Sequence, residues 1–120
     1  MTKILVVDDS TVQKLVITRV LDKLDVEYVE AKNGKEGVEQ ALKHRPDLIL
    51  MDIIMPDCNG FQAIRMLQRH DETKDVPVIV VSTKSLNVDK IWAKRQGAAD
   101  YIVKPIDEAE LIEKIKKHLP

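Results

Sequence analysis

The residues of this sequence that could do chemistry together begin with three aspartates that follow short apolar segments. Asp8 and Asp9 come directly after KILVV, and Asp52 comes directly after LILM. Carboxylates that meet in one crevice repel one another and raise one another's pKa values unless a cation lies among them. Mg²⁺ suits such a site because it accepts carboxylate oxygens, keeps several waters and leaves coordination positions free for phosphate oxygens. The three aspartates therefore predict a magnesium site and indicate phosphoryl transfer.

A hydroxyl and an ammonium follow two further apolar segments. Ser82 comes after PVIVV, and Lys104 comes after DYIV. A carboxylate such as Asp52 can attack phosphorus and form an aspartyl phosphate, and the transferring group needs cations and hydrogen-bond donors around its oxygens. Taken singly, each residue is explained as a cap, a turn residue or a solvated lysine, and it is their combination that favours the functional interpretation. Pro105 follows Lys104, and a cis bond between them would turn the lysine inward.

Five short β-branched runs predict the strands that position these residues. We expect strands over Lys3–Val7, Val26–Glu30, Leu48–Met51, Pro77–Val81 and Asp100–Val103. The first, third and fourth are apolar on consecutive residues, which is typical of strands covered on both faces. The second has Glu27 and Glu30 interleaved, which favours a position nearer an edge of the sheet.

Segments with helical spacing and start signals lie between the strands. The expected start residues are Ser10, Asn33, Asn59, Ser85 and Asp107, and Gly97 is expected to end the fourth helix. The apolar residues at helical spacing are Val12, Leu15, Val16, Val20 and Leu24 in the first helix, Phe61, Ile64 and Leu67 in the third, Val88, Ile91 and Trp92 in the fourth, and Leu111, Ile112, Ile115 and Leu119 in the fifth. We interpret Trp92 as a residue that fills a gap between helices rather than one that marks a partner surface.

The strict alternation of strands and helices defines the expected α/β architecture. Repeated strand–helix units imply right-handed crossovers and a doubly wound parallel sheet with helices on both faces. In such sheets, functional groups gather outside the carboxyl ends of the strands. That rule is why we expect the aspartates, the serine and the lysine to meet in one crevice.

Composition limits the classes of function. The chain has 120 residues, enough for one domain with a substantial core, and a net charge of −1. No broad basic field is expected for nucleic acid or an anionic membrane, and no apolar run approaches the ~20 residues that span a bilayer. The single cysteine, Cys58, has no sequence neighbours that would lower its pKa, and it favours a cytoplasmic location without disulfides.

Four segments in order resemble the response-regulator receiver domains of two-component signalling. They are ILVVDDS, DLILMDIIMPDCNG, VPVIVVST and GAADYIVKP, which are spread from residue 4 to residue 105, and the resemblance covers the whole chain. The resemblance implies a flavodoxin-like fold with strand order 2-1-3-4-5 and five helices. From the length and the lack of a linker or effector segment, we expect one domain over residues 1–120 and no output domain in this chain. It also implies phosphorylation of Asp52 by a histidine kinase and a Mg²⁺ ion held by Asp9, Asp52 and the backbone carbonyl of Ile54, with Asp8 contributing through water.

The resemblance extends to the expected switch and output. Ser82 and Lys104 would contact the phosphoryl oxygens, and Tyr101 would move inward as Ser82 shifts toward them. A downstream protein would then bind the face made by the fourth helix, fifth strand and fifth helix. GFQAIR and STKSLNVDKIWAKRQGAADYIVKP resemble the stand-alone receivers of chemotaxis-like systems that control type IV pilus twitching motility.

At three positions near the expected site, the residue either departs from the commonest family pattern or occupies a position that affects dephosphorylation. Thr83 is larger than the residue often found there, and Ile54 and Lys84 occupy positions that tune dephosphorylation in this family. We hypothesise that apolar Ile54 orients an attacking water poorly, so that the phosphorylated state is long-lived.

Three other readings remain open from the sequence. A haloacid-dehalogenase-type phosphatase would depend on Asp8, but its Asp-x-Asp motif is replaced here by Asp8-Asp9-Ser10. A flavin-binding electron carrier would need phosphate-binding donors where the first loop carries two carboxylates. A pseudo-receiver would bind partners regardless of Asp52.

Overall fold

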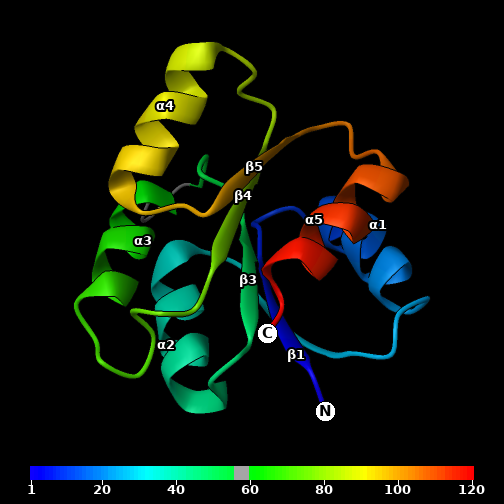
Figure 1. The fold of residues 1–120 in the computed structure, drawn as a ribbon, viewed down its shortest axis with the longest axis horizontal. Helices are drawn as coiled ribbons and strands as arrows, with labels where there is room; N and C mark the ends of the chain where they lie inside the picture. Colours follow the sequence, from blue (N-terminus) through cyan, green and yellow to red (C-terminus); the bar gives the residue numbers. More distant parts are fainter. Residues whose placement is uncertain (56–59) are drawn as a thin grey trace.

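The computed structural model describes residues 1–55 and 60–120 and contains one parallel sheet (Figure 1). Its strands are β1 (Lys3–Val7), β2 (Glu27–Ala31), β3 (Leu48–Met51), β4 (Val78–Ser82) and β5 (Asp100–Val103). Their order in the sheet is β2-β1-β3-β4-β5, as predicted, with β2 at an edge. Three strands match the predicted bounds, and β2 and β4 are shifted by one residue toward the C-terminus.

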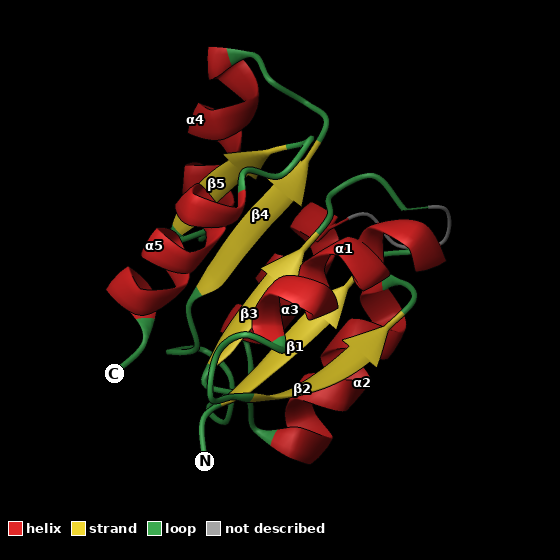
Figure 2. Ribbon diagram, turned by 90° about the vertical axis from the view of Figure 1, so that its right-hand side faces the viewer, coloured by secondary structure: helices red, strands yellow, loops and turns green. Residues whose placement is uncertain are grey.

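Within residues 1–55 and 60–120, five helices cover the two faces of the sheet. They are α1 (Thr11–Leu21), α2 (Gly34–His44), α3 (Gly60–Gln68), α4 (Asn87–Gln96) and α5 (Glu108–His118). Figure 1 shows α2, α3 and α4 on one face and α1 and α5 on the other, and Figure 2 shows the strands from a second direction. Each face has its own apolar core, because alternate strand residues such as Leu5 and Val6 point to opposite sides.

Side-chain caps begin three helices at the predicted residues. The Ser10 hydroxyl accepts from the Gln13 N–H at 3.2 Å. The Asn33 and Asp107 side chains accept in the same way, at 2.8 Å and 3.3 Å, at the starts of α2 and α5. Gly97, at φ 113°, ends α4 as expected. The predicted start at Ser85 is wrong, because Leu86 is the residue before α4.

Two helices expose apolar residues that the sequence pattern had assigned to the core. In α1, Val12, Leu15 and Val16 are exposed, while Ile17, Val20 and Leu21 are buried. In α4, Val88, Ile91 and Trp92 are exposed and Ala93 is buried, so Trp92 does not fill a gap between helices. The assignment failed in α4 because this helix packs against the edge strand β5 and α3, where a single alanine makes the inner contact.

Gly60 allows α3 to begin directly against the residues that follow β3. A Cβ atom at Gly60 would lie 2.5 Å from the Asp52 carbonyl oxygen and 2.7 Å from the Ile53 Cα. The Gly60 N–H also donates to the Ile53 carbonyl at 3.2 Å. The close approach therefore requires glycine and fixes the backbone beside Asp52. The predicted cap Asn59 and the single cysteine Cys58 lie outside the described residues.

None of the helices in the described ranges combines the length and apolar character needed to cross a membrane.

Candidate functional site

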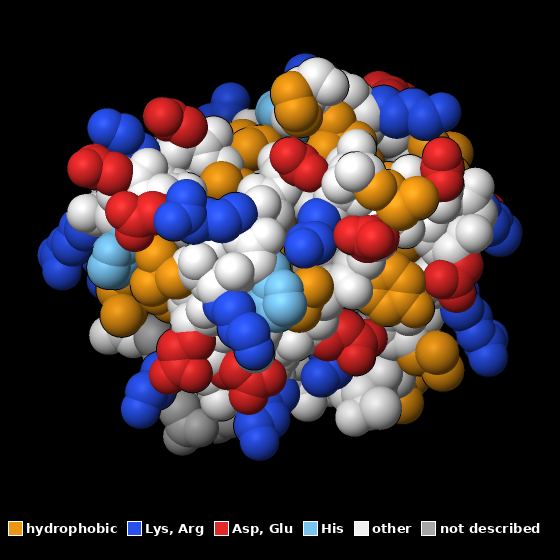
Figure 3. Space-filling model, turned by 90° about the horizontal axis from the view of Figure 1, so that it is seen from below, with side chains coloured by type: hydrophobic (Ala, Val, Ile, Leu, Met, Phe, Trp, Pro, Cys, Tyr) orange, Lys and Arg blue, Asp and Glu red, His pale blue; other side chains and the backbone are white. Residues whose placement is uncertain are grey.

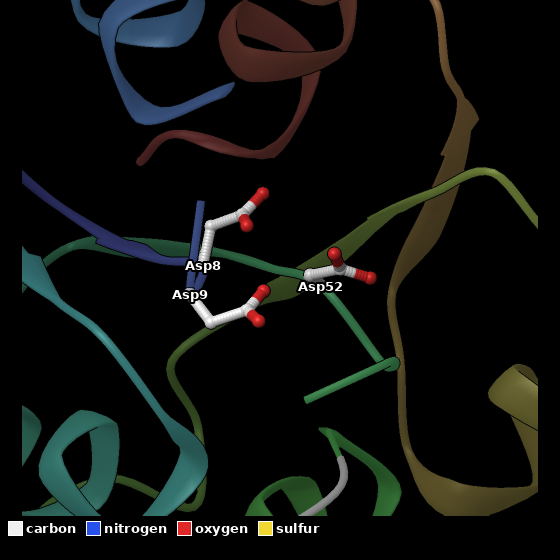
Figure 4. Close-up of side chains that lie close together, drawn as sticks. All are labelled: Asp8, Asp9 and Asp52. Atoms are coloured by element: carbon white, nitrogen blue, oxygen red, sulfur yellow. The ribbon is translucent and has the colours of Figure 1, made fainter. Parts of the chain in front are cut away.

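Three carboxylates gather at the carboxyl end of the sheet (Figure 4). Asp8 and Asp9 follow β1, and Asp52 follows β3, which is the neighbour of β1 in the sheet. One carboxylate oxygen from each lies within 4.8 Å of the others. Asp8 and Asp52 are buried and Asp9 is exposed, so the cluster opens to solvent on the Asp9 side.

Lys104 is the internal counter-ion of this cluster. Its ammonium donates to Asp8 Oδ2 at 2.8 Å and to Asp52 Oδ2 at 3.1 Å, and its side chain is almost fully buried. The bond between Lys104 and Pro105 is cis. Burial alone would lower the pKa of Lys104, but the hydrogen bond to Asp8 and the negative charges of Asp52 and Asp8 raise it above its ordinary value. The lysine therefore stays charged and bridges two carboxylates that would otherwise repel.

Backbone N–H groups orient the other oxygens of the same two carboxylates. Ser10 donates to Asp8 Oδ1 at 2.9 Å, and Ile54 donates to Asp52 Oδ1 at 3.0 Å. Three carboxylates facing one ammonium leave two negative charges without an internal partner in the cluster. Hard oxygen donors with excess negative charge fit a hard divalent cation such as Mg²⁺.

Ser82 and Tyr101 both contact Lys84 in the loop after β4. The Ser82 hydroxyl is buried and accepts from the Lys84 N–H at 3.3 Å. The Tyr101 hydroxyl donates to the Lys84 carbonyl at 2.8 Å, so the tyrosine already lies inward in this structure. Burial raises the pKa of Tyr101, and the charges of Asp89 and Asp52 add to that increase, while the hydrogen bond with Ser82 opposes it.

Hydrogen bonds to backbone carbonyls connect Lys104 to Ser82, and helix α5 to Tyr101. The Lys104 N–H donates to the Ser82 carbonyl at 2.8 Å, which places the lysine beside the end of β4. On the other side of β5, the Lys114 ammonium donates to the Tyr101 carbonyl at 2.7 Å. Sequence reasoning missed the Lys84 carbonyl and Lys114, and a backbone acceptor leaves no side-chain signature by which it could have been found.

Asp100, at the start of β5, contacts two side chains of helix α5. It contacts the Lys114 ammonium at 3.3 Å and the His118 ring at 2.9 Å. Burial would raise the pKa of Asp100, but hydrogen bonds from His118 and the Tyr101 N–H, together with the Lys114 charge, hold it below its ordinary value. Lys114 and His118 are four residues apart on α5, and their shared helix face was the one sequence signal for the pair.

Comparison with known proteins identifies the class to which this fold and site belong. Residues 4–116 match the response regulator receiver domain, and the chain therefore belongs to the receiver family of two-component signalling. Receiver domains are signalling domains and bind Mg²⁺ in an acidic active site.

Particular relatives cover the chain almost completely. Protein PilH of Pseudomonas aeruginosa is 48% identical over 115 residues, which are 96% of this chain and 95% of that protein. The chemotaxis protein CheY4 of Vibrio cholerae superposes with a TM-score of 0.93 at 28% identity, over 99% of each chain. The receiver domain of sensor histidine kinase PA1611 from Pseudomonas aeruginosa has a magnesium ion in its active site cleft. It superposes with a TM-score of 0.90 at 30% identity, over 98% of this chain and 96% of that one.

Replacing Lys104 by methionine tests its role as counter-ion. At pH 7 and without divalent metal, we expect Lys104→Met to lower the free energy of unfolding by roughly 3 kcal/mol, because two buried carboxylates lose their shared cation. Because the pKa of Lys104 is raised in the folded protein, this stabilisation is fully present below pH 10.5, the ordinary pKa of lysine. It is lost only as the pH rises through the higher pKa of the folded state. Urea denaturation measures the change.

The matched control is Lys23→Met, because Lys23 pairs with Glu108 at 2.6 Å on the surface. Exposed pairs of this kind contribute less than ~1 kcal/mol. Equal stability of the two variants would show that Lys104 does not neutralise the cluster.

Proposed function

We propose that this chain is a response-regulator receiver whose Asp52 accepts a phosphoryl group from a histidine kinase in a Mg²⁺-dependent reaction. The observation that carries the proposal is the position of the Asp52 carboxylate, which lies beside Asp8 and Asp9 and is held by Lys104 and the Ile54 N–H. Phosphorylation would then change the binding surface for a partner protein. The chain would catalyse only its own phosphorylation and dephosphorylation.

The proposed metal ligands are Asp9, Asp52 and the backbone carbonyl of Ile54, with Asp8 contributing through water. The clustered carboxylates and their excess negative charge support this assignment. When bound, Mg²⁺ supplies positive charge against the carboxylates and the phosphoryl oxygens. Lys104 supplies the second positive charge, and its contacts with the carboxylates of Asp8 and Asp52 support this role.

The covalent step joins Asp52 to the phosphorus of a phosphohistidine. An Asp52 carboxylate oxygen attacks phosphorus, an O–P bond forms and the N–P bond breaks. The electron pair of that bond returns to the imidazole nitrogen, which takes up a proton. In this account Lys104 and the Ser82 hydroxyl then contact the phosphoryl oxygens and stabilise their charge.

The loop after β4 connects the proposed phosphorylation site to the binding surface for a partner. Ser82 now accepts from Lys84, and Tyr101 donates to the carbonyl of the same residue. A Ser82 hydroxyl that turns to the phosphoryl group would release the Lys84 N–H and change how Tyr101 is held. The affected face is the one formed by α4, β5 and α5, where Ile91, Tyr101 and Lys114 line a pocket. A shift from 1:99 to 99:1 between two such states needs ~5.5 kcal/mol of differential interaction.

A chemotaxis-like motility pathway is the proposed setting. Its support is the similarity to Protein PilH and to a chemotaxis protein, together with the sequence resemblance to twitching-motility receivers. We propose a cytoplasmic location on the single cysteine, and protein partners rather than nucleic acid on the balanced charge. Figure 3 shows one face of the molecule on which acidic and basic side chains are interspersed.

Intact mass spectrometry after incubation with acetyl phosphate and Mg²⁺ tests the phosphoacceptor. We expect one added phosphoryl group on the wild type, lost in Asp52→Ala, in Asp52→Asn and after chelation of the metal, because each change removes the nucleophile or the cation. Asp71→Asn is the control, since that side chain is 90% exposed and remote from the cluster in sequence. Labelling that persists in Asp52→Asn would refute the assignment, and steady phosphate release that depends on Asp8 would instead indicate a phosphatase.

The lifetime of the phosphoryl group tests the hypothesis on Ile54. The Ile54 side chain is exposed beside the site, where an amide could hold a water by a hydrogen bond that the aliphatic side chain cannot make. One added hydrogen bond of ~1.4 kcal/mol corresponds to about tenfold in rate. We therefore expect Ile54→Asn to lose phosphate about ten times faster than the wild type, timed by phosphate release. Met66→Asn on α3 is the control, and unchanged or slower decay in Ile54→Asn would refute the hypothesis.

A further inference from the structure

Two side chains of α5 contact the start of β5 through one carboxylate. Helix α5 lies against β5 (Figure 2). The His118 ring nitrogen Nε2 lies 2.9 Å from Asp100 Oδ2, and the Lys114 ammonium lies 3.3 Å from Asp100 Oδ1. An ionised carboxylate only accepts hydrogen bonds, so the imidazole is the donor. The side chains of Asp100 and His118 are each 19% exposed, so water screens this contact less than it screens a surface pair.

The same residues hold the backbone of Tyr101 on both sides. The Tyr101 N–H donates to Asp100 Oδ1 at 2.8 Å, and the Lys114 ammonium donates to the Tyr101 carbonyl at 2.7 Å. We call Asp100, Lys114 and His118 the β5–α5 latch. The latch therefore positions the peptide groups of the tyrosine whose hydroxyl contacts Lys84.

Histidine is the residue type in the latch that gains or loses a proton near neutral pH. Its ordinary pKa is ~6.5, whereas aspartate and lysine ordinarily keep their charges from about pH 5.5 to about pH 8. Despite the opposing effect of burial, hydrogen bonds hold the pKa of Asp100 below its ordinary value, so its carboxylate stays ionised. A charged donor forms a hydrogen bond roughly twice as strong as a neutral one. The contact between His118 and Asp100 is therefore stronger when the ring carries a proton.

The charges around His118 also favour a proton on the ring. It lines a pocket with carboxylates that follow α2 or lie between α3 and β4, namely Asp47, Asp71, Glu72 and Asp75. It is also the last residue of α5, where the helix dipole favours positive charge. The nearby cations are Lys114, which also contacts Glu110 at 3.7 Å, Lys74, which contacts Asp71 at 3.5 Å, and the exposed Lys116 and Lys117. Together with Asp100, the carboxylates outnumber these cations.

We propose that His118 makes the β5–α5 latch sensitive to pH. A proton on the ring tightens the contact with Asp100, and its loss leaves Lys114 as the only cation that the described residues place on that carboxylate. The contact exists only in the folded chain. Protonation therefore stabilises the fold below the ordinary histidine value of ~6.5, and this stabilisation is lost as the pH rises above it.

The latch itself needs no phosphoryl group. Its consequence for signalling rests on the proposed function, in which Tyr101 is held differently once Ser82 turns to the phosphoryl group. A tighter latch at low pH holds the peptide groups of Tyr101 more firmly. The concentration of protons thus becomes a second input to the same tyrosine.

The Tyr101 amide signal in two-dimensional ¹H–¹⁵N NMR spectra tests this inference, because this N–H donates to Asp100. We expect its chemical shift to titrate between about pH 5.5 and about pH 8 in the wild type and to stay constant in His118→Gln. His44→Gln is the matched control and should keep the wild-type titration. His44 is also the last residue of its helix, α2, but its side chain has no hydrogen bond or ion pair within residues 1–55 and 60–120.

Urea denaturation over the same pH range measures the stabilisation. From about pH 8 to about pH 5.5, we expect the unfolding equilibrium constant to fall about tenfold further in the wild type than in His118→Gln, which corresponds to about 1.4 kcal/mol. Asp100→Asn should lose the same pH dependence, because the ring then has no carboxylate to contact. Lys114→Gln should increase it, because no second cation then shares the carboxylate.

The wild-type titration needs no variant, and circular dichroism verifies that each variant is folded. A Tyr101 amide signal that stays constant with pH in the wild type would overturn the inference, as would one that titrates equally in His118→Gln. An extra pH dependence of unfolding that survives in both His118→Gln and Asp100→Asn would overturn it too.

Acetyl phosphate labelling of the same wild-type sample, read by intact mass, separates the two proposals. Labelled protein whose Tyr101 amide does not titrate would overturn only the inference on the latch. Unlabelled protein in which the titration depends on His118 would overturn the phosphoacceptor assignment and leave the latch standing.

Discussion

Three carboxylates at the carboxyl end of the sheet repel one another, and this repulsion governs how the site is built. Because β1 and β3 are parallel neighbours, the residues after them meet at one edge of the sheet and cannot separate. Lys104 offsets part of this negative charge. It is 96 residues from Asp8 in sequence and follows β5, the outermost strand on the side of the sheet opposite β2. One internal cation cannot balance three anions, and the remaining negative charge suits the site to a divalent cation.

The carboxyl end of the sheet also connects the charged site to the surface of the protein. Lys104 donates through its backbone to the last residue of β4, Ser82, and Ser82 in turn holds the loop in which Lys84 binds the Tyr101 hydroxyl. A change in charge at Asp52 would therefore act on groups that are hydrogen-bonded to Lys84, in the loop that leads to α4. The two apolar cores fix the strands on both faces. Among the described helices, α4 buries the fewest residues, which is consistent with the proposed change in its contacts.

Much of this arrangement could be predicted from the sequence. Apolar runs that end at Asp8, Asp52 and Lys104 predict three of the strands. Because the strands are parallel, the same pattern predicts that these three residues meet at the carboxyl end of the sheet. The failures have physical causes. Helical periodicity finds an apolar face but does not say whether the fold covers it, so Trp92 was assigned to the interior. Backbone groups such as the Lys84 carbonyl carry no sequence signature, so the partner of the tyrosine hydroxyl could be found only in three dimensions.

We propose that the acidic cluster is a metal site whose charge is balanced in part by Lys104. Isothermal titration calorimetry of Mg²⁺ binding tests this proposal on the wild type, Asp9→Asn and Asp52→Asn, with Asp71→Asn as the control for loss of a surface charge. We expect one Mg²⁺ site in the wild type and the control, and strongly weakened binding in the two cluster variants. Equal Mg²⁺ affinity in all four proteins, or no binding to the wild type, would contradict it.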